Sequence, residues 1–183
     1  MSLPSRPLTL TINGQRHGPI EVPEGMMMID VLHEMLDLTG SRLGCGQGIC
    51  HACVVIWDRD DRTSEEVPTC ITGAHFFDGK RIRTIEGVAQ RNDKGDIVAL
   101  SPVQQAFLDR FSFQCGYCTP GFVNAATVLI ERLARAPVSR AELDATITAA
   151  LDNHICRCTG YVRYYQAVRD VILATPGLTR ETA

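Results

Sequence analysis

The sequence predicts an α+β protein whose first half mixes short strands with one helix and whose second half is helical. Near the start of the chain, apolar residues alternate with polar ones, as in a half-buried strand. After residue 100, apolar residues recur at helical spacing in four segments. Between the two patterns, residues 86–100 contain several Gly, Asn, Asp and Lys residues. We therefore expect a first domain over residues 1–85, a linker over 86–100 and a second domain over 101–183.

The first domain should begin with a hairpin followed by a helix. Residues 8–12 have the alternating pattern of a strand, and the Asn13-Gly14 pair after them is a strong hairpin-turn signal. Residues 20–22 fit a second strand, which a Pro-Glu-Gly sequence ends. Residues 26–38 carry apolar side chains at helical spacing, which predicts an amphipathic helix.

The remainder of the first domain should consist of loops and two more strands. Residues 41–51 predict a loop with three glycines and two cysteines. Residues 54–57 predict a buried strand, and residues 81–85 predict a last strand. Residues 58–66, DRDDRTSEE, predict a charged loop. This loop is either a solvated surface segment or a contact for a partner protein.

The second domain should contain four helices. Residues 101–104 combine an N-cap serine, a proline at the first helical position and a capping-box glutamine. A Thr-Pro pair at 119–120 starts the second helix, and a Ser-x-x-Glu capping box at 139–142 starts the third. The fourth helix carries an apolar stripe formed by Tyr161, Tyr165, Val168 and Ile172. Four short helices predict a four-helix bundle.

Composition limits the classes of function. The chain has 183 residues, 45% of them hydrophobic and 21% charged, which is a globular balance. A formal net charge of −3 disfavours a general nucleic-acid-binding protein. Residues 1–11 show no apolar core of a signal peptide, and no apolar stretch reaches the roughly 20 residues that span a bilayer. We expect a cytoplasmic protein, or alternatively a periplasmic or membrane-associated one that an exported partner carries.

The first four of the eight cysteines have the spacing of a plant-type ferredoxin site. Cys45, Cys50 and Cys53 form a C-x4-C-x2-C pattern, and Cys70 follows at a distance. Four thiolates must surround a small inorganic core, and backbone amides must point at its sulfurs. A glycine-rich loop allows both, because glycine reaches backbone angles closed to other residues. These four residues are the candidate ligands of one [2Fe–2S] cluster.

The other four cysteines, Cys115, Cys118, Cys156 and Cys158, form a C-x2-C pair and a C-x-C pair. Cys118 and Cys158 each precede a predicted helix start, where free amides and the helix dipole favour a thiolate. Two helix starts brought together would hold a second cluster. A zinc site with four cysteine ligands remains open for both groups, and more so for the second. A disulfide scaffold is disfavoured because no secretion signal is visible.

Several segments resemble the iron–sulfur subunit of the xanthine oxidase family of molybdenum hydroxylases and aldehyde dehydrogenases. The resemblance covers nearly the whole chain, and the order and separation of the segments match. The matching segments are residues 38–40 (LTG), 44–50 (GCGQGIC), 84–87 (TIEG), 103–107 (VQQAF), 114–121 (QCGYCTPG) and 156–161 (CRCTGY).

The resemblance implies a ferredoxin-like β-grasp domain followed by a four-helix bundle. It implies that the bundle cluster lies near a molybdopterin cofactor in a large partner subunit, with Gln114 and Cys158 as possible contacts. The other cluster would face an electron acceptor, either a flavin subunit, a cytochrome or another carrier. The implied function is electron transfer during oxidation of an aldehyde or an N-heterocycle. We assign no catalytic residue to this chain, because it has no acid–base constellation of its own.

Two histidines depart from the pattern of the family. His51 stands where glycine is usual, and Asn153-His154 stand where Gly-Asn is usual. His51 is either a solvent-facing loop residue, which is the commoner case, or an imidazole that tunes the first cluster. We expect His154 to serve packing or an interface rather than ligation.

Two other classes of function compete with the electron-transfer subunit. The first is a free two-cluster ferredoxin-like carrier, which the helical half disfavours because a carrier needs only one exposed cluster. The second is a zinc-binding interaction module. Colour and metal analysis separate the zinc module from an iron–sulfur protein.

Overall fold

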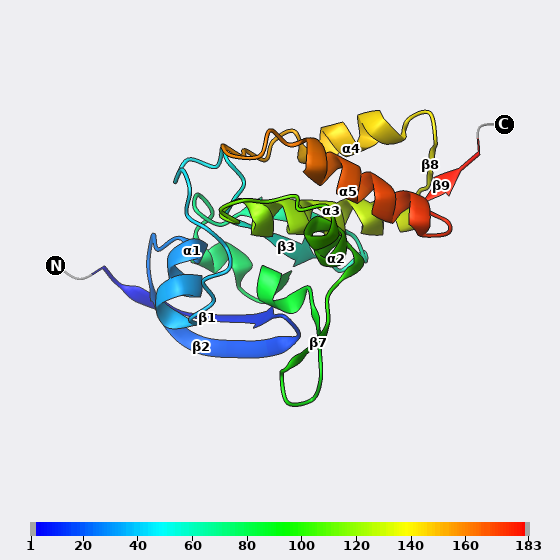
Figure 1. Ribbon diagram of the computed structural model, residues 1–183. Helices are drawn as coiled ribbons and strands as arrows, with labels where there is room; N and C mark the ends of the chain where they lie inside the picture. The colour runs from blue at the N-terminus through cyan, green and yellow to red at the C-terminus, as the bar shows by residue number, and fades with distance from the viewer. Residues whose placement is uncertain (1–2, 182–183) are drawn as a thin grey trace.

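The computed structural model describes residues 3–181 and confirms the α+β class (Figure 1). Its first half is built on a five-stranded mixed sheet with strand order β2-β1-β5-β3-β4. Strands β1 and β5 are parallel, and the other neighbouring pairs are antiparallel. The strands are β1 (Ser5–Ile12), β2 (Gln15–Pro23), β3 (Val54–Asp58), β4 (Ser64–Pro68) and β5 (Arg81–Arg83).

The predicted hairpin is confirmed. Strands β1 and β2 pair from Ser5 opposite Pro23 to Ile12 opposite Gln15. Asn13 and Gly14 connect them with φ angles of 52° and 81°, the left-handed values that a tight two-residue hairpin turn requires. The alternating apolar residues of β1 are fully buried in the core beneath the sheet.

The predicted helix over 26–38 is shorter than expected. It comprises α1 (Met28–Asp30) and a wider π-helical turn, η1 (Val31–Met35). Its apolar residues pack on the sheet as predicted. The helix ends early because Asp37 takes a left-handed φ of 55°, and the Leu38 amide turns back to donate to the Leu32 carbonyl.

The predicted charged loop over 58–66 is partly wrong, since β3 includes residue 58 and β4 occupies residues 64–66. β4 pairs with β3 along its whole length and forms the edge of the sheet. Of its residues only Val67 is buried. A charged edge strand carries almost no apolar signal, although its charges protect the edge from pairing with other chains. The true loop is reduced to residues 59–63.

The segment between the halves is not featureless. It contains the 3-10 turn η3 (Ile85–Gly87) and a small hairpin of β6 (Gln90–Arg91) and β7 (Ile97–Ala99). This hairpin projects away from the sheet and the helices in Figure 1. A similar 3-10 turn, η2 (Ala74–Phe77), covers the core of the first half.

The second half contains four longer helices around one apolar core. The predicted capping box at Ser101 is present, with both reciprocal hydrogen bonds. A short parallel pair of β8 (Val138–Ser139) and β9 (Thr179–Arg180) ties the end of the described chain to the segment before α4. The helices are α2 (Pro102–Asp109), α3 (Thr119–Arg135), α4 (Leu143–Leu151) and α5 (Val162–Ala174).

The apolar stripe predicted on the last helix is confirmed in part, since Val168 and Ile172 are fully buried. Tyr161 has a φ of 71° and precedes the helix, which begins at Val162. Tyr164, rather than Tyr165, is the fully buried tyrosine. Its ring stacks on Phe122 of α3 with the ring centres 4.2 Å apart and the planes 4° from parallel.

Helix α3 joins the two halves, because it packs across strands β3 and β4 (Figure 1). The buried Asn124 amide donates to the Val54 carbonyl oxygen of β3 at 2.9 Å. Farther along the helix, Glu131 accepts two hydrogen bonds from Arg83 of β5. No helix within residues 3–181 has the length and apolar character needed to cross a bilayer.

Candidate metal centres

The first two cysteines lie in a glycine-rich loop without regular secondary structure. Gly46 and Gly48 take left-handed φ angles of 67° and 70°. A Cβ atom at Gly48 would lie 2.4 Å from the Cδ1 atom of Ile71, and the left-handed φ makes any other residue strained there. The Gln47 amide donates to the Cys45 Sγ atom at 3.3 Å. The loop thus presents backbone N–H groups to a thiolate, as the sequence predicted.

The β3–β4 hairpin brings the other two cysteines of the first group together. Cys53 immediately precedes β3 and Cys70 follows β4, and both are buried. The Thr69 hydroxyl donates to the Cys53 carbonyl oxygen at 2.7 Å and fixes the two ends. Cys53 and Cys70 are far apart in the sequence because the whole β3–β4 hairpin lies between them.

The thiols of the first group differ in acidity. Backbone hydrogen bonds, mainly from Cys50 and Gln47, lower the pKa of Cys45 to about 6. Burial raises the pKa of Cys53 to about 11. A buried thiolate needs a bound cation, because burying an uncompensated charge is strongly unfavourable. The pair of low and high pKa values fits a loop shaped to surround a metal centre.

The second group assembles at the start of α3 and in the loop before α5. Cys118 is the N-cap of α3, as predicted. The Sγ atoms of Cys115 and Cys158 lie 3.8 Å apart, and those of Cys156 and Cys158 lie 3.9 Å apart. Four thiolates bound tetrahedrally at 2.3 Å from a metal would be separated by about 3.8 Å. These two separations match that value, and all eight cysteines carry free thiols.

The helix-dipole argument holds only in part. Burial raises the pKa of Cys118 to about 12 although the residue caps a helix, so desolvation outweighs the dipole. Helix α5 begins only at Val162, so Cys158 does not lie at a helix start. Cys156 is different: burial opposes its ionisation, but hydrogen bonds from the Thr159 hydroxyl and backbone amides lower its pKa to about 7.

Two tyrosines support the second group. The Tyr161 hydroxyl accepts a hydrogen bond from the Cys156 amide at 3.2 Å. The buried Tyr164 hydroxyl lies 3.7 Å from the Cys118 sulfur and 2.7 Å from the Thr119 hydroxyl. The sequence shows tyrosines at and before the start of α5, but it contains no signal that two of them contact the cysteine loops.

The two cysteine groups meet. Cys50 of the first group and all four cysteines of the second group line one cavity of about 210 Å³. The Ile155 amide donates to the Cys50 carbonyl oxygen at 3.1 Å, and the Tyr117 hydroxyl donates to the Leu43 carbonyl oxygen at 2.8 Å. The first of these bonds links the backbone of Cys50 directly to Ile155, the residue that precedes Cys156.

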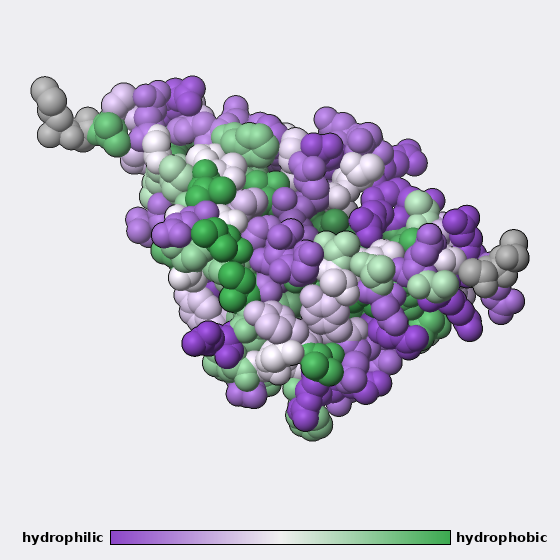
Figure 2. Space-filling view, turned by 90° about the horizontal axis from the view of Figure 1, so that it is seen from above, coloured by the Kyte–Doolittle hydropathy of each residue, from purple (hydrophilic) through white to green (hydrophobic). Residues whose placement is uncertain are grey.

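The residues expected to contact a partner cofactor lie at the surface. Gln114, Cys115 and Cys158 are exposed. In the space-filling view, apolar surface occurs as patches between polar residues (Figure 2). Large apolar side chains exposed in the segments around the second group are those of Leu108, Phe111, Tyr117, Ile155 and Val162.

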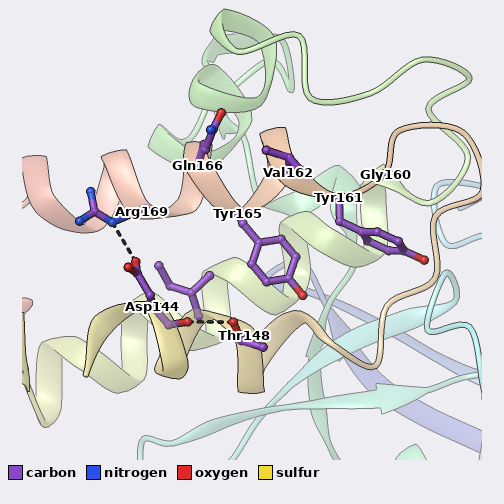
Figure 3. A pocket seen from close by; sticks show the side chains of 9 residues that line it. Asp144, Thr148, Gly160, Tyr161, Val162, Tyr165, Gln166 and Arg169 are labelled. Carbon is purple, nitrogen blue, oxygen red and sulfur yellow. Dashed lines mark hydrogen bonds and ion pairs between the residues drawn. The ribbon is translucent and has the colours of Figure 1, made fainter. Parts of the chain in front are cut away.

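A groove lies between α4 and α5 (Figure 3). It has a volume of about 420 Å³, and Tyr161 and Tyr165 line it. Its lining carboxylate, Asp144, is paired with Arg169 at 2.8 Å. The groove therefore presents aromatic surface, and its carboxylate is held in an ion pair with Arg169.

His51 is only partly exposed to solvent, so the interpretation as a solvent-facing loop residue is not confirmed. The residue is half-buried, and its Nδ1 atom is buried without a hydrogen-bond partner. Its ring contacts that of His154 edge-on, with the ring centres 5.1 Å apart. His154 lies at the interface between the halves, as expected, and bonds to Glu66 of β4.

Comparison with known proteins gives two domain matches. Residues 10–75 match the model of the 2Fe-2S iron-sulfur cluster binding domain, and residues 84–169 match that of the [2Fe-2S] binding domain. The chain is 35% identical to the nicotinate dehydrogenase small FeS subunit of Eubacterium barkeri, covering 88% of this chain and 92% of the relative. It is also 35% identical to the nicotine 6-hydroxylase small subunit of Paenarthrobacter nicotinovorans, covering 93% and 89%.

Solved structures agree with the sequence relatives. Quinoline 2-oxidoreductase from Pseudomonas putida 86 matches with a TM-score of 0.76 and 29% identity, over 95% of this chain and 93% of that one. Aldehyde oxidoreductase from Desulfovibrio gigas matches with a TM-score of 0.75 and 32% identity, over 97% of this chain and 19% of that one. Two [2Fe–2S] clusters and a role in electron transfer follow from these matches. The chain belongs to the iron–sulfur subunits of the xanthine oxidase family of molybdenum hydroxylases and aldehyde oxidoreductases.

Proposed function

We propose that this chain takes electrons from a molybdopterin centre in a large partner subunit and passes them to an acceptor through its two clusters. The observation that carries this proposal is the hydrogen bond between the Ile155 amide and the Cys50 carbonyl oxygen. It joins the ligand loops of the two groups directly. The two sites are thus neighbours in one path, rather than independent centres at opposite ends of the chain.

We assign each cluster to one group of cysteines. The first [2Fe–2S] cluster is held by Cys45, Cys50, Cys53 and Cys70, and the second by Cys115, Cys118, Cys156 and Cys158. When bound, each cluster supplies a site that accepts and releases one electron. The mixed sheet supports a β-grasp assignment for residues 1–85, and the helices α2 to α5 support a four-helix bundle over 101–183.

We propose a direction of transfer that the exposure of the second group supports. Cys115 and Cys158 are exposed, whereas Cys118 and Cys156 are buried, so the second group opens to the surface on one side. Exposed apolar side chains accompany that opening, among them Phe111 at 74% exposure. Large exposed apolar residues near a site mark a protein interface. We place the large subunit there, with Gln114 and Cys158 toward its cofactor.

The first group faces the acceptor in this scheme. Cys45 and Cys50 are partly exposed in their loop, which leaves an exit for electrons. We propose a flavin subunit or a cytochrome as the acceptor. The names of the relatives, which include nicotinate dehydrogenase and an aldehyde oxidoreductase, support an N-heterocycle or an aldehyde as the substrate. The substrate pocket would belong to the large subunit.

A ligand variant tests the path in the assembled complex. Cys115→Ala should remove the electron paramagnetic resonance signal of one reduced cluster and leave the other. Substrate should still reduce the partner's centre, but turnover with the acceptor should stop. Gln105→Ala is the control and should keep both signals, because Gln105 is exposed on α2 and its side chain bonds to Asp109 of the same helix. A Cys115→Ala complex with full turnover would show that electrons take another route.

A further inference from the structure

Two histidines and one glutamate from three separate segments meet between the halves of the molecule. His51 comes from the first cysteine loop, Glu66 from β4 and His154 from the loop before Cys156. One ligand atom of each lies within 4.8 Å of the other two. The Nε2 atom of His154 is 2.7 Å from a carboxylate oxygen of Glu66. Neither half contains this set by itself.

The hydrogen bonding of the cluster is incomplete. His154 is only 2% exposed, and the Nδ1 atoms of both histidines are buried without a partner. Buried polar nitrogens are normally paired, so these two require an explanation. A cavity of about 220 Å³ adjoins them and is lined by His51, Glu66 and His154. There is space beside the three side chains for an additional group.

The backbone at His51 is also unfavourable for histidine. Its φ of 56° lies in the left-handed region, where glycine is the relaxed residue. The Cβ atom that alanine would place at Gly121 would meet the His51 carbonyl oxygen at 2.4 Å, so α3 packs closely on this turn. Sparsely populated backbone conformations persist where the surroundings enforce them, and they gather at functional sites.

We propose that His51, Glu66 and His154 bind one divalent transition-metal ion of the zinc type. Two imidazoles and one carboxylate are an established donor set for zinc, with a fourth position left open. Tetrahedral zinc with bonds of 2.0–2.1 Å would bring its ligands to about 3.3 Å from one another. Zinc binding would widen the His154–Glu66 separation from 2.7 Å and shorten the longer separations, which are at most 4.8 Å, through small rotations of the three side chains.

The local charges favour a cation. Glu66 supplies a negative charge at the centre of the cluster, and its side chain is only 21% exposed. Arg132 also lines the cavity, but it is exposed, so solvent screens its charge. A bound ion would connect β4 and the first cysteine loop to the loop that carries Cys156, and would therefore fasten the two halves together.

Zinc binding is tested on protein whose clusters are loaded, so that the cysteines are occupied. After incubation with Zn²⁺ and gel filtration, metal analysis should find one zinc per chain beside an unchanged iron content. Glu66→Gln keeps a hydrogen-bonding group but loses the charge and should lose the zinc. The loss of affinity should exceed the roughly 10- to 100-fold cost of losing an outer-shell partner.

His51→Gly gives a second test, because glycine is relaxed at this φ and the variant should fold. It should retain iron and lose zinc, whereas the control His17→Gln, on β2, should retain both. Zinc should raise the thermal midpoint of the wild type and the control only. Equal zinc binding by wild type and Glu66→Gln, or no zinc in the wild type, would overturn the site. Turnover and iron content are measured separately, so this result leaves the electron path untouched.

Discussion

The ion-pair network around Arg83 should hold the two halves of the molecule together. The guanidinium donates to Glu131 of α3 at 2.7 and 3.0 Å, and to Asp58 of β3 at 2.7 to 3.1 Å. The three side chains are 25%, 32% and 33% exposed, so the network is mostly shielded from water. Ser64 of β4 adds a hydrogen bond to Glu131 at 2.5 Å. We expect Glu131→Gln to weaken this network but to leave the hydrogen bonds between Arg83 and Asp58 in place.

The size of the effect follows from the geometry. A hydrogen bond to a charged group contributes about 1.5–3 kcal/mol, and solvent screening reduces that figure at a partly exposed site. Asp58 still neutralises Arg83, and the new amide oxygen still accepts one bond. Glu131→Gln should therefore lower the free energy of unfolding by about 1–2 kcal/mol. The exposed pair Asp144–Arg169 is the control, and Asp144→Asn should cost no more than about 0.5 kcal/mol.

The same substitution should change the pH dependence of stability. Burial raises the pKa of Glu131, but hydrogen bonds from Arg83 and Ser64 outweigh it and lower the pKa below its ordinary value of 4.5. A carboxyl whose pKa is lowered by folding stabilises the protein above its unfolded pKa, and this contribution disappears as pH falls through the folded pKa. The difference between wild type and Glu131→Gln should therefore shrink below about pH 4.5.

Urea denaturation followed by circular dichroism measures this difference at pH 7 and at pH 4. Comparing the two chains at each pH removes contributions that they share, including any loss of clusters. Equal stability at pH 7 would show that the Arg83 network is no stronger than a surface ion pair. A difference that is unchanged at pH 4 would show that the charge of Glu131 is not its cause.

Three further substitutions test other contacts. Phe122→Ala removes a fully buried ring stacked on Tyr164 and should lower the free energy of unfolding by about 3–5 kcal/mol in thermal or urea denaturation; a loss below about 1 kcal/mol would contradict the packing. Gly121→Ala forces a Cβ atom to 2.4 Å from the His51 carbonyl oxygen and should lower the free energy of unfolding by about 1–3 kcal/mol. An unchanged free energy of unfolding would mean that the backbone at His51 moves to accommodate the methyl group. His51→Gly should keep both clusters and shift the reduction potential of one, since it removes an imidazole beside Cys50. An unchanged redox titration would exclude tuning by this residue.

The elements that the sequence predicted correctly are those defined by neighbouring residues. The Asn13-Gly14 turn and the Ser101 capping box depend on contacts within a few positions, so their patterns suffice. Strand β4 was missed because its partner, β3, supplies its hydrogen bonds and only Val67 needs to be buried. Tyr164 was undervalued because the apolar pattern did not distinguish it from its neighbours Tyr161 and Tyr165, of which Tyr161 takes a left-handed φ and precedes α5.

The candidate ligands were likewise predictable one group at a time. The C-x4-C-x2-C spacing indicates a ferredoxin-type loop without any tertiary information. The spacing carries no information about the distance between the two groups, which depends on the Ile155–Cys50 hydrogen bond. The meeting of His51 with His154 was equally invisible, because residues so far apart in sequence are brought together only by the packing of α3 on the sheet.

Helix α3 is the element that sets the relation between the two metal centres. Its N-cap is Cys118, a proposed ligand of the second cluster. Its middle is fixed to β3 by the bond from Asn124 to Val54, the residue after Cys53. Its last turns are fixed to β5 through Glu131 and Arg83. One rigid helix thus connects a ligand of each cluster. The separation of the clusters therefore depends on the α3–sheet contact together with the Ile155–Cys50 hydrogen bond.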